Sequence, residues 1–117
     1  MLYDNIIYGK GGGKKIEPLK KLSDGELINL YLQGDFEAKK VLFFRYYGLL
    51  KSIAKDISFQ CKVQYKKVFS DGIKIYYRGV DSYNFKGSFR NFLIGYIYQN
   101  LPYKPKIERN EFFWEED

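Results

Sequence analysis

Apolar residues recur every three or four positions along the middle of the chain, which is the spacing of one face of an α-helix. The first such stretch is LSDGELINLYLQGD, in which Ser23 and Glu26 have the spacing of a capping box. Gly34 is a natural C-terminal cap, and Asp35 is suited to begin the next helix at once. The pattern therefore predicts a first helix that ends at a sharp Gly-Asp turn.

The next stretch, about residues 36–57, is apolar on two sides. One face carries Ala38, Leu42, Tyr46, Leu49, Ile53 and Ile57, and the other carries Phe43, Tyr47, Leu50 and Ala54. A helix with two apolar faces is expected to lie centrally and to pack against neighbours on both sides. Its Phe and Tyr residues are therefore expected in the core.

Two more helices are predicted after it. The third covers about residues 62–78; its segment IKIYY also suits a strand, but no partner strand with turn signals lies nearby. Gly72 inside this helix indicates either close packing against a neighbour or a kink. Ser88 is expected to cap the fourth helix, which ends near residue 101 because Pro102 has no backbone N–H and clashes with the preceding turn. The inner face of this helix is expected to carry Phe89, Phe92, Leu93, Tyr96 and Ile97, and its outer side Arg90, Asn91, Ile94, Tyr98 and Gln99.

These elements predict an all-α fold, a small bundle of about four helices. The helical domain is expected over residues 22–101. Residues 1–21 are expected to form a flexible N-terminal arm with the linker GKGGGKK, and residues 102–117 a Pro-containing segment with an acidic, aromatic tail.

The composition argues against several classes of function. The chain has 117 residues and no histidine, which removes the commonest general base and the commonest ligand for transition metals. Cys61 is the only cysteine, and we interpret it as a small buried hydrophobe rather than a catalytic thiol. The segment GKGGGKK has the wrong spacing for a phosphate loop, with Lys15 where Ser or Thr is required. We therefore expect a protein that is not an enzyme and that needs no metal or cofactor.

The expected location is the cytoplasm. No apolar run approaches the roughly 18 residues of a membrane-spanning helix. The N-terminus MLYDNIIYGKGGGKK lacks the basic-then-apolar order of a signal peptide, and a lone cysteine fits a reducing compartment.

The net charge of +6 is unevenly distributed along the chain. Residues 62–106 carry nine basic and two acidic groups, a net charge of +7, whereas residues 107–117 carry one basic and five acidic groups, a net charge of −4. This pattern indicates a polyanionic partner, with the tail as a competitor for the same surface; patterning for solubility is the alternative. The tail combines three aromatic residues with five acids. It suits packing of its aromatic rings on the bundle, docking to a partner, or covering the basic surface as an acidic mimic of the polyanion.

Two stretches of the chain resemble region 2 of bacterial RNA polymerase sigma factors, and the extracytoplasmic-function type is the most similar. LSDGELINLYLQGDFEAKKVLFFRYYGLLKSIAKDI is similar to that family's opening, an acidic-apolar helix, a Gly-Asp hinge and a long helix. VFSDGIKIYYRGVDSYNFKGSFRNFLIGYIYQN is similar to the stretch that follows, a helix with an Asp-Leu-Val-Gln-Glu core, an aromatic loop and a further helix. The similarity covers residues 22–100.

The sequence departs from the family at several positions. Lys67 stands where the family has Asp and Ser70 where it has Gln, so that only the acid of this polar trio is kept, as Asp71. Phe92 replaces the family's Trp. In the family the last helix continues where Pro102 ends it here, and the residues after it are too few for a second, promoter-recognising domain.

The resemblance implies specific partners and sites. In sigma factors the helix matching residues 62–78 docks on the RNA polymerase core, which here assigns polymerase binding to Lys67, Ser70, Asp71 and Lys74. The following loop and helix open the promoter and capture an unstacked base of the single-stranded minus-ten DNA, which here assigns DNA binding to Tyr83, Asn84, Phe85, Lys86, Arg90 and Asn91. An anti-sigma factor or another protein is a further partner that the family implies.

The residue types are consistent with this assignment but leave alternatives open. Aromatic faces stack on exposed bases, and lysine and arginine neutralise phosphates. Phe89 is expected in the core, whereas Tyr83 and Phe85 suit either base stacking or anchoring of the loop. The leading hypothesis is a sigma-like transcription initiation protein; the alternatives are a protein-interaction module that does not read DNA and a generic basic nucleic-acid-binding bundle. Exposure of both Tyr83 and Phe85 supports DNA capture, and burial of both supports the interaction module.

Overall fold

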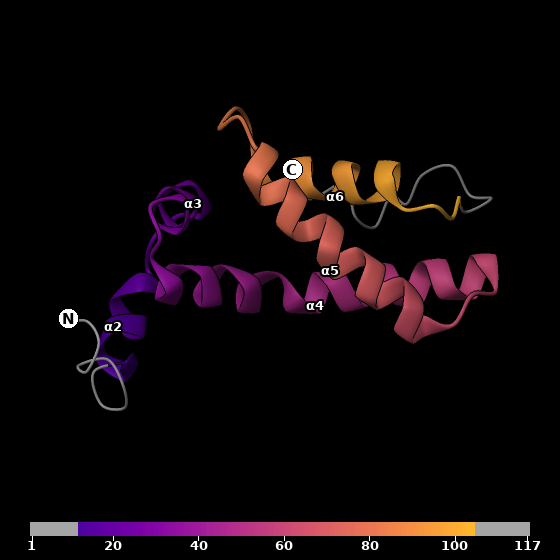
Figure 1. Ribbon diagram of the computed structural model, residues 1–117, viewed down its shortest axis with the longest axis horizontal. Coiled ribbons are helices and arrows are strands. Elements are labelled where there is room, and N and C mark those ends of the chain that lie inside the picture. The colour runs from indigo at the N-terminus through magenta and orange to yellow at the C-terminus, as the bar shows by residue number, and fades with distance from the viewer. Residues whose placement is uncertain (1–11, 105–117) are drawn as a thin grey trace. The chain divides into compact units, whose positions relative to one another are not determined.

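The computed structural model describes residues 12–104, with side chains from residue 16 onward (Figure 1). All regular structure in this range is helical, which confirms the all-α prediction, and IKIYY is part of a helix rather than a strand. The chain divides between Tyr46 and Tyr47 into two compact units, called here the N-terminal and the C-terminal unit. The helices are α2 (Gly12–Leu19), α3 (Asp24–Leu32), α4 (Phe36–Cys61), α5 (Tyr65–Ser82) and α6 (Phe89–Asn100), and α4 contributes to both units.

The start of α3 has the predicted capping box. The backbone N–H of Glu26 donates to the Ser23 hydroxyl over 3.1 Å, and the backbone N–H of Ser23 donates to the Glu26 carboxylate over 2.9 Å. Two backbone donors that a helix leaves without intrahelical partners are thereby satisfied.

The turn between α3 and α4 also forms as predicted. Gly34 has a φ of +99°, a left-handed conformation that favours glycine. Its N–H donates to the carbonyl of Tyr31 over 2.9 Å, and the N–H of Asp35 donates to that of Leu30 over 3.0 Å, which is the pair of bonds of a Schellman motif. The Asp35 carboxylate then accepts hydrogen bonds of 3.0 and 3.1 Å from two backbone N–H groups in the first turn of α4. One Gly-Asp pair thus ends one helix and begins the next.

The core of the N-terminal unit is formed by α3 and the first half of α4. Its buried side chains are Leu27, Ile28, Ala38, Val41, Leu42 and Tyr46. The Tyr46 hydroxyl donates to the Asp24 carboxylate, and the Arg45 guanidinium binds the same carboxylate over 2.8 Å. These polar contacts join the two helices at the edge of the apolar core.

The expectation of a flexible arm over residues 1–21 is wrong for residues 12–19, which form α2 despite two glycines and Pro18. Arg45 of α4 donates to the carbonyl of Lys20 over 3.1 Å, just beyond the end of this helix. Ile16 and Leu19 are partly buried. Tertiary contacts therefore stabilise a helix that its own sequence disfavours. The rest of the predicted arm, residues 1–11, lies outside the described residues.

The C-terminal unit is built from the second half of α4 together with α5 and α6 (Figure 1). Its buried residues are Leu50, Ile53, Ala54 and Ile57 of α4, Val68, Gly72, Ile75, Tyr76, Gly79 and Val80 of α5, and Phe89, Leu93, Ile94 and Ile97 of α6, with Leu101 just after it. Ile94 is fully buried, although it was predicted on the outer side of its helix. The hydroxyl of Tyr98 donates to Asp56 of α4 over 2.9 Å, so α6 contacts α4 as well as α5. Contact with two helices buries a wider part of the surface of α6 than contact with one helix would.

The predicted helix boundaries differ from the observed ones between α4 and α5. Helix α4 continues four residues further than predicted, to Cys61, and is followed by Lys62 in the left-handed conformation, with a φ of 57°. Helix α5 accordingly begins at Tyr65 instead of residue 62 and extends to Ser82. The predicted end of α6 is confirmed, because Leu101 has an extended backbone before Pro102.

Two buried glycines of α5 have different surroundings. A methyl group at Gly79 would lie 3.1 Å from the Tyr96 ring and 3.4 Å from the Leu93 side chain of α6, so the two helices approach closely there. A methyl group at Gly72 would meet no atom within 4 Å, and this residue lines a narrow apolar gap that has no room for water. The close approach of the helices is therefore at Gly79, and the close packing that was one of the two alternatives for Gly72 is not found there.

We expect Gly72→Ala to stabilise the protein by about 1 kcal/mol, because alanine is the better helix former and the space for its methyl group already exists. Gly79→Ala gains the same helix propensity but overpacks the contact with Tyr96, which costs about 1–3 kcal/mol. Urea unfolding of both variants measures the difference. Equal stabilisation by the two substitutions would contradict this account of the packing.

Candidate functional site

The loop between α5 and α6, residues 83–88, is held by side chains of its own. Tyr83 follows the last residue of α5, is 9% exposed, and donates from its hydroxyl to the carbonyl of Gly87. The Asn84 side chain accepts from the backbone N–H of Lys86 over 2.9 Å, which forms an Asx turn. The Ser88 hydroxyl accepts from the backbone of α6 over 2.9 Å and caps that helix, as predicted. Hydrogen bonds at both ends thus give the loop a defined conformation.

Phe85 is the exposed aromatic residue of this loop. Its side chain is 44% exposed and its φ is +64°, a left-handed conformation that side chains other than Gly, Asn and Asp rarely adopt. One edge of the ring is supported by Tyr83, with 5.0 Å between the ring centroids. Tyr83 in turn contacts Phe89 and Phe92 of α6, with centroid distances of 5.2 and 5.4 Å. Two buried rings, Tyr83 and Phe89, and the partly buried Phe92 therefore form a cluster that supports one exposed ring.

The six residues assigned to DNA binding divide into three groups. Asn84, Phe85 and Lys86 are exposed at the tip of the loop, whereas Tyr83 is buried beneath it. Arg90 and Asn91 are partly buried on the first turn of α6. The side-chain oxygen of Asn91 is buried and has no hydrogen-bond partner among the described residues. Tyr83 is buried and Phe85 is exposed, so the pair meets neither of the two conditions set by the sequence, exposure of both rings or burial of both. Phe89 lies in the core as expected.

The residues assigned to polymerase binding lie on the outer face of α5. Lys67, Ser70 and Lys74 are exposed, and Arg78 extends the same face by one more turn. Lys67, Lys74 and Arg78 follow one another at intervals of seven and four residues, which places them on one side of the helix. This face leads along α5 to the exposed loop.

Asp71 is the acidic residue of that face, and it is paired. The Tyr103 hydroxyl donates to its carboxylate over 2.7 Å, and the Lys67 amine lies 3.5 Å from the same oxygen. The hydrogen bond from Tyr103 lowers the pKa of the Asp71 carboxyl below its ordinary value, and the positive charge of Lys67 acts in the same direction.

The contribution of Tyr103 was not predicted from the sequence. Tyr103 contacts α5, and the Lys104 amine donates to the carbonyls of Tyr98 and Gln99 at the end of α6 over 3.3 and 3.2 Å. A basic residue after the last turn of a helix is the signal that indicates the second contact. No comparable local signal exists for the first, since 32 positions separate Tyr103 from Asp71.

Residues 12–104 contain no group of three or more acidic or cysteine side chains placed to hold a metal ion. Within the same residues, no helix has the length and apolar character needed to cross a membrane. What the loop and α5 offer chemically is an aromatic face, amide groups and cations, which are groups for binding.

Comparison of the chain with models of protein families, with curated proteins and with solved structures finds no match in any of the three.

We expect Tyr103→Phe to raise the pKa of Asp71 toward its ordinary value of 3.8, because the substitution removes the strongest stabilisation of the carboxylate. Since the pKa is lowered in the folded protein, this contact stabilises the fold above pH 3.8, and the contribution is lost as the pH falls through the folded-state pKa. An NMR titration of the side-chain carboxyl carbons measures the shift.

Tyr98→Phe is the matched control, because its hydroxyl donates to Asp56 and leaves Asp71 untouched. An Asp71 pKa that is the same in Tyr103→Phe and in the wild type would contradict the assignment.

Proposed function

We propose that this protein is a non-enzymatic transcription initiation protein whose α5–α6 loop binds single-stranded promoter DNA and whose α5 face contacts the RNA polymerase core. The proposal combines the resemblance of residues 22–100 to sigma factor region 2 with the geometry of the C-terminal unit. In it, Phe85 stacks on an unpaired base of the minus-ten region, and the cations of α5 and the loop neutralise phosphates.

The exposed ring of Phe85 is the observation that carries the proposal. Apolar side chains gain free energy when they are buried, so an aromatic residue left 44% exposed in a left-handed conformation costs stability twice. A base that covers the ring removes the first of these costs, because base–aromatic stacking contributes about 1–3 kcal/mol. The Tyr83 cluster and the Asx turn hold the ring in place, so little conformational entropy is lost when DNA binds.

The charge of the surrounding surface favours a nucleic acid as the partner. Lys86 is next to Phe85 in the loop, and Lys74 and Arg78 are exposed on α5 before it, where Asp81 is the one exposed acid of the last turn. Phosphate contacts of this kind position a single strand without regard to sequence, whereas the aromatic ring requires that the base be unstacked. Together they favour a single strand over a duplex.

A protein-interaction module without DNA binding is the second candidate. The burial of Tyr83 favours this candidate, because it leaves only Phe85 of the aromatic pair exposed for a base. The pairing of Asp71 with Tyr103 and Lys67 also favours it, because the acid kept from the sigma-factor trio is already bound within the protein. In this candidate the outer face of α5 binds a protein, and the exposed Phe85 is one more contact for that partner.

The test is fluorescence anisotropy with a labelled AT-rich single strand, with and without RNA polymerase core. Phe85→Ala is expected to weaken binding roughly 5- to 150-fold, which corresponds to the loss of about 1–3 kcal/mol of stacking. Phe85→Tyr keeps an aromatic face and is expected to retain binding. Phe59→Ala is the matched control, because Phe59 is 83% exposed on α4 and has no place in the proposed site.

A salt series separates the two kinds of contact. Lys86→Ala is expected to reduce the slope of log Kd against log salt concentration by about 0.7, the value for one phosphate contact on a single strand, whereas Phe85→Ala leaves the slope unchanged. Binding to polymerase without any measurable DNA binding would favour the interaction module, and equal effects of Phe85→Ala and Phe59→Ala would exclude a stacking role for the loop.

A further inference from the structure

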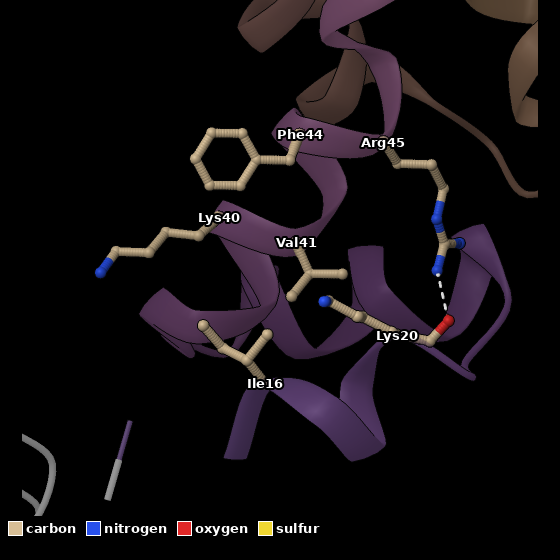
Figure 2. Close-up of a pocket in the computed structure, with 6 residues that line it drawn as sticks. All are labelled: Ile16, Lys20, Lys40, Val41, Phe44 and Arg45. Carbon is tan, nitrogen blue, oxygen red and sulfur yellow. Dashed lines mark hydrogen bonds between the residues drawn. The ribbon is translucent and has the colours of Figure 1, made fainter. Parts of the chain in front are cut away.

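The N-terminal unit contains a pocket that the proposed function does not use. It lies between α2 and the first half of α4 and has a volume of about 290 Å³ (Figure 2). The lining residues are Ile16, Lys20, Lys40, Val41, Phe44 and Arg45.

The pocket has an apolar centre that is open to solvent. Val41 is buried at its base, and Figure 2 shows Ile16 and Phe44 facing the same space from α2 and α4. Phe44 is 69% exposed, which leaves most of an aromatic ring in water. Phe36, two turns earlier on α4, is 64% exposed, so the apolar surface continues along the helix. Exposed apolar surface next to a pocket is typical of an interaction site.

The edges of the pocket are positively charged. Lys40 is exposed between Phe36 and Phe44, and it has no ion-pair or hydrogen-bond partner among the described residues. The Lys20 amine pairs with Glu17 over 3.3 Å, but both side chains are more than half exposed, so this pair contributes little stability and exchanges readily for another carboxylate.

Arg45 has a different role, because both sides of its guanidinium group are used within the protein. It binds Asp24 over 2.8 Å and the carbonyl of Lys20 over 3.1 Å. These bonds position the end of α2 beside α4, so Arg45 is a positioning residue of the pocket, and the charges left for a ligand are those of Lys20 and Lys40.

We propose that this pocket is a docking site for an acidic peptide segment of a partner protein that inserts one aromatic or large aliphatic side chain. The volume is at the lower limit of sites for small molecules, and it suits a single large side chain better than a whole ligand. The two lysines at its edges complement carboxylates that flank such a side chain. A nucleic acid would satisfy the lysines and the Phe44 ring, but the aliphatic side chains of Ile16 and Val41 offer no ring on which a base could stack.

The site is independent of the proposed DNA-binding loop. Every residue that lines it belongs to the N-terminal unit, whereas residues 83–88 belong to the C-terminal unit. Loss of one activity without the other therefore distinguishes the two proposals.

The test is a titration of the full chain with a labelled synthetic peptide of the sequence EEEEFEEEE, which places one aromatic side chain among acids and does not occur in this chain. The expected result is saturable binding that weakens at high salt, and no binding of a peptide in which the acids are replaced by lysine. Lys40→Glu and Phe44→Ala are each expected to weaken binding about five- to tenfold.

Two substitutions further along α4 are matched controls. Lys55→Glu reverses an exposed charge and Phe59→Ala removes an exposed ring outside the pocket, and both are expected to leave peptide binding within about twofold. Phe44→Ala is also expected to leave binding of single-stranded DNA unchanged, and Phe85→Ala to leave peptide binding unchanged.

Trp114, the only tryptophan of the chain, provides a second measurement. With an external partner as the occupant, quenching of Trp114 fluorescence by iodide is expected to be the same in the wild type and in Phe44→Ala. Protection of Trp114 that Phe44→Ala abolishes would overturn the proposal in favour of the chain's own tail as the occupant. Absence of peptide binding, or equal effects of Phe44→Ala and Phe59→Ala, would also overturn it.

Discussion

The arrangement of the candidate DNA-binding loop depends on the burial of Tyr83. Its hydroxyl closes the loop onto Gly87, and its ring lies against Phe85, Phe89 and Phe92. Because Tyr83 fills the space beneath the loop, Phe85 remains outside in a left-handed conformation. The same residue ends α5. One aromatic side chain thus links the core of the C-terminal unit to the exposed surface that we propose as functional.

Helix α5 has two roles in the C-terminal unit, one on each side. Its inner side approaches α6 closely at Gly79, where a methyl group would lie 3.1 Å from the Tyr96 ring and 3.4 Å from Leu93. Its outer side carries Lys67, Lys74 and Arg78 and faces solvent. Packing with α6 consequently orients the cations relative to the loop. In the function we propose, this fixed relation lets phosphate contacts and base stacking act on one bound strand.

The polar contacts of the N-terminal unit have a comparable role for the pocket. Asp24 receives hydrogen bonds from both Arg45 and Tyr46, and Arg45 continues to the carbonyl at the end of α2. Without these bonds, the short α2 has too few residues to remain helical in water. The pocket therefore exists because the Arg45 guanidinium, itself bound to Asp24, holds the end of α2 against α4. Its apolar residues are those that we propose for a partner.

The sequence by itself determined the all-α class and those helix ends that a cap or a turn marks, because caps and turns depend on hydrogen bonds within a few residues. For this reason the sequence correctly predicted four such features: the Ser23–Glu26 capping box, the Gly34–Asp35 turn, the Ser88 cap and the end of α6 before Pro102. Only the tertiary structure decided which aromatic residues are exposed, since Tyr83 and Phe85 have the same local signals but different neighbours. The partners of Asp71 and Arg45, the formation of α2 and the burial of Ile94 likewise depend on contacts between residues far apart in the chain. Such contacts are set by how helices pack, and the spacing of residues along one helix does not specify them.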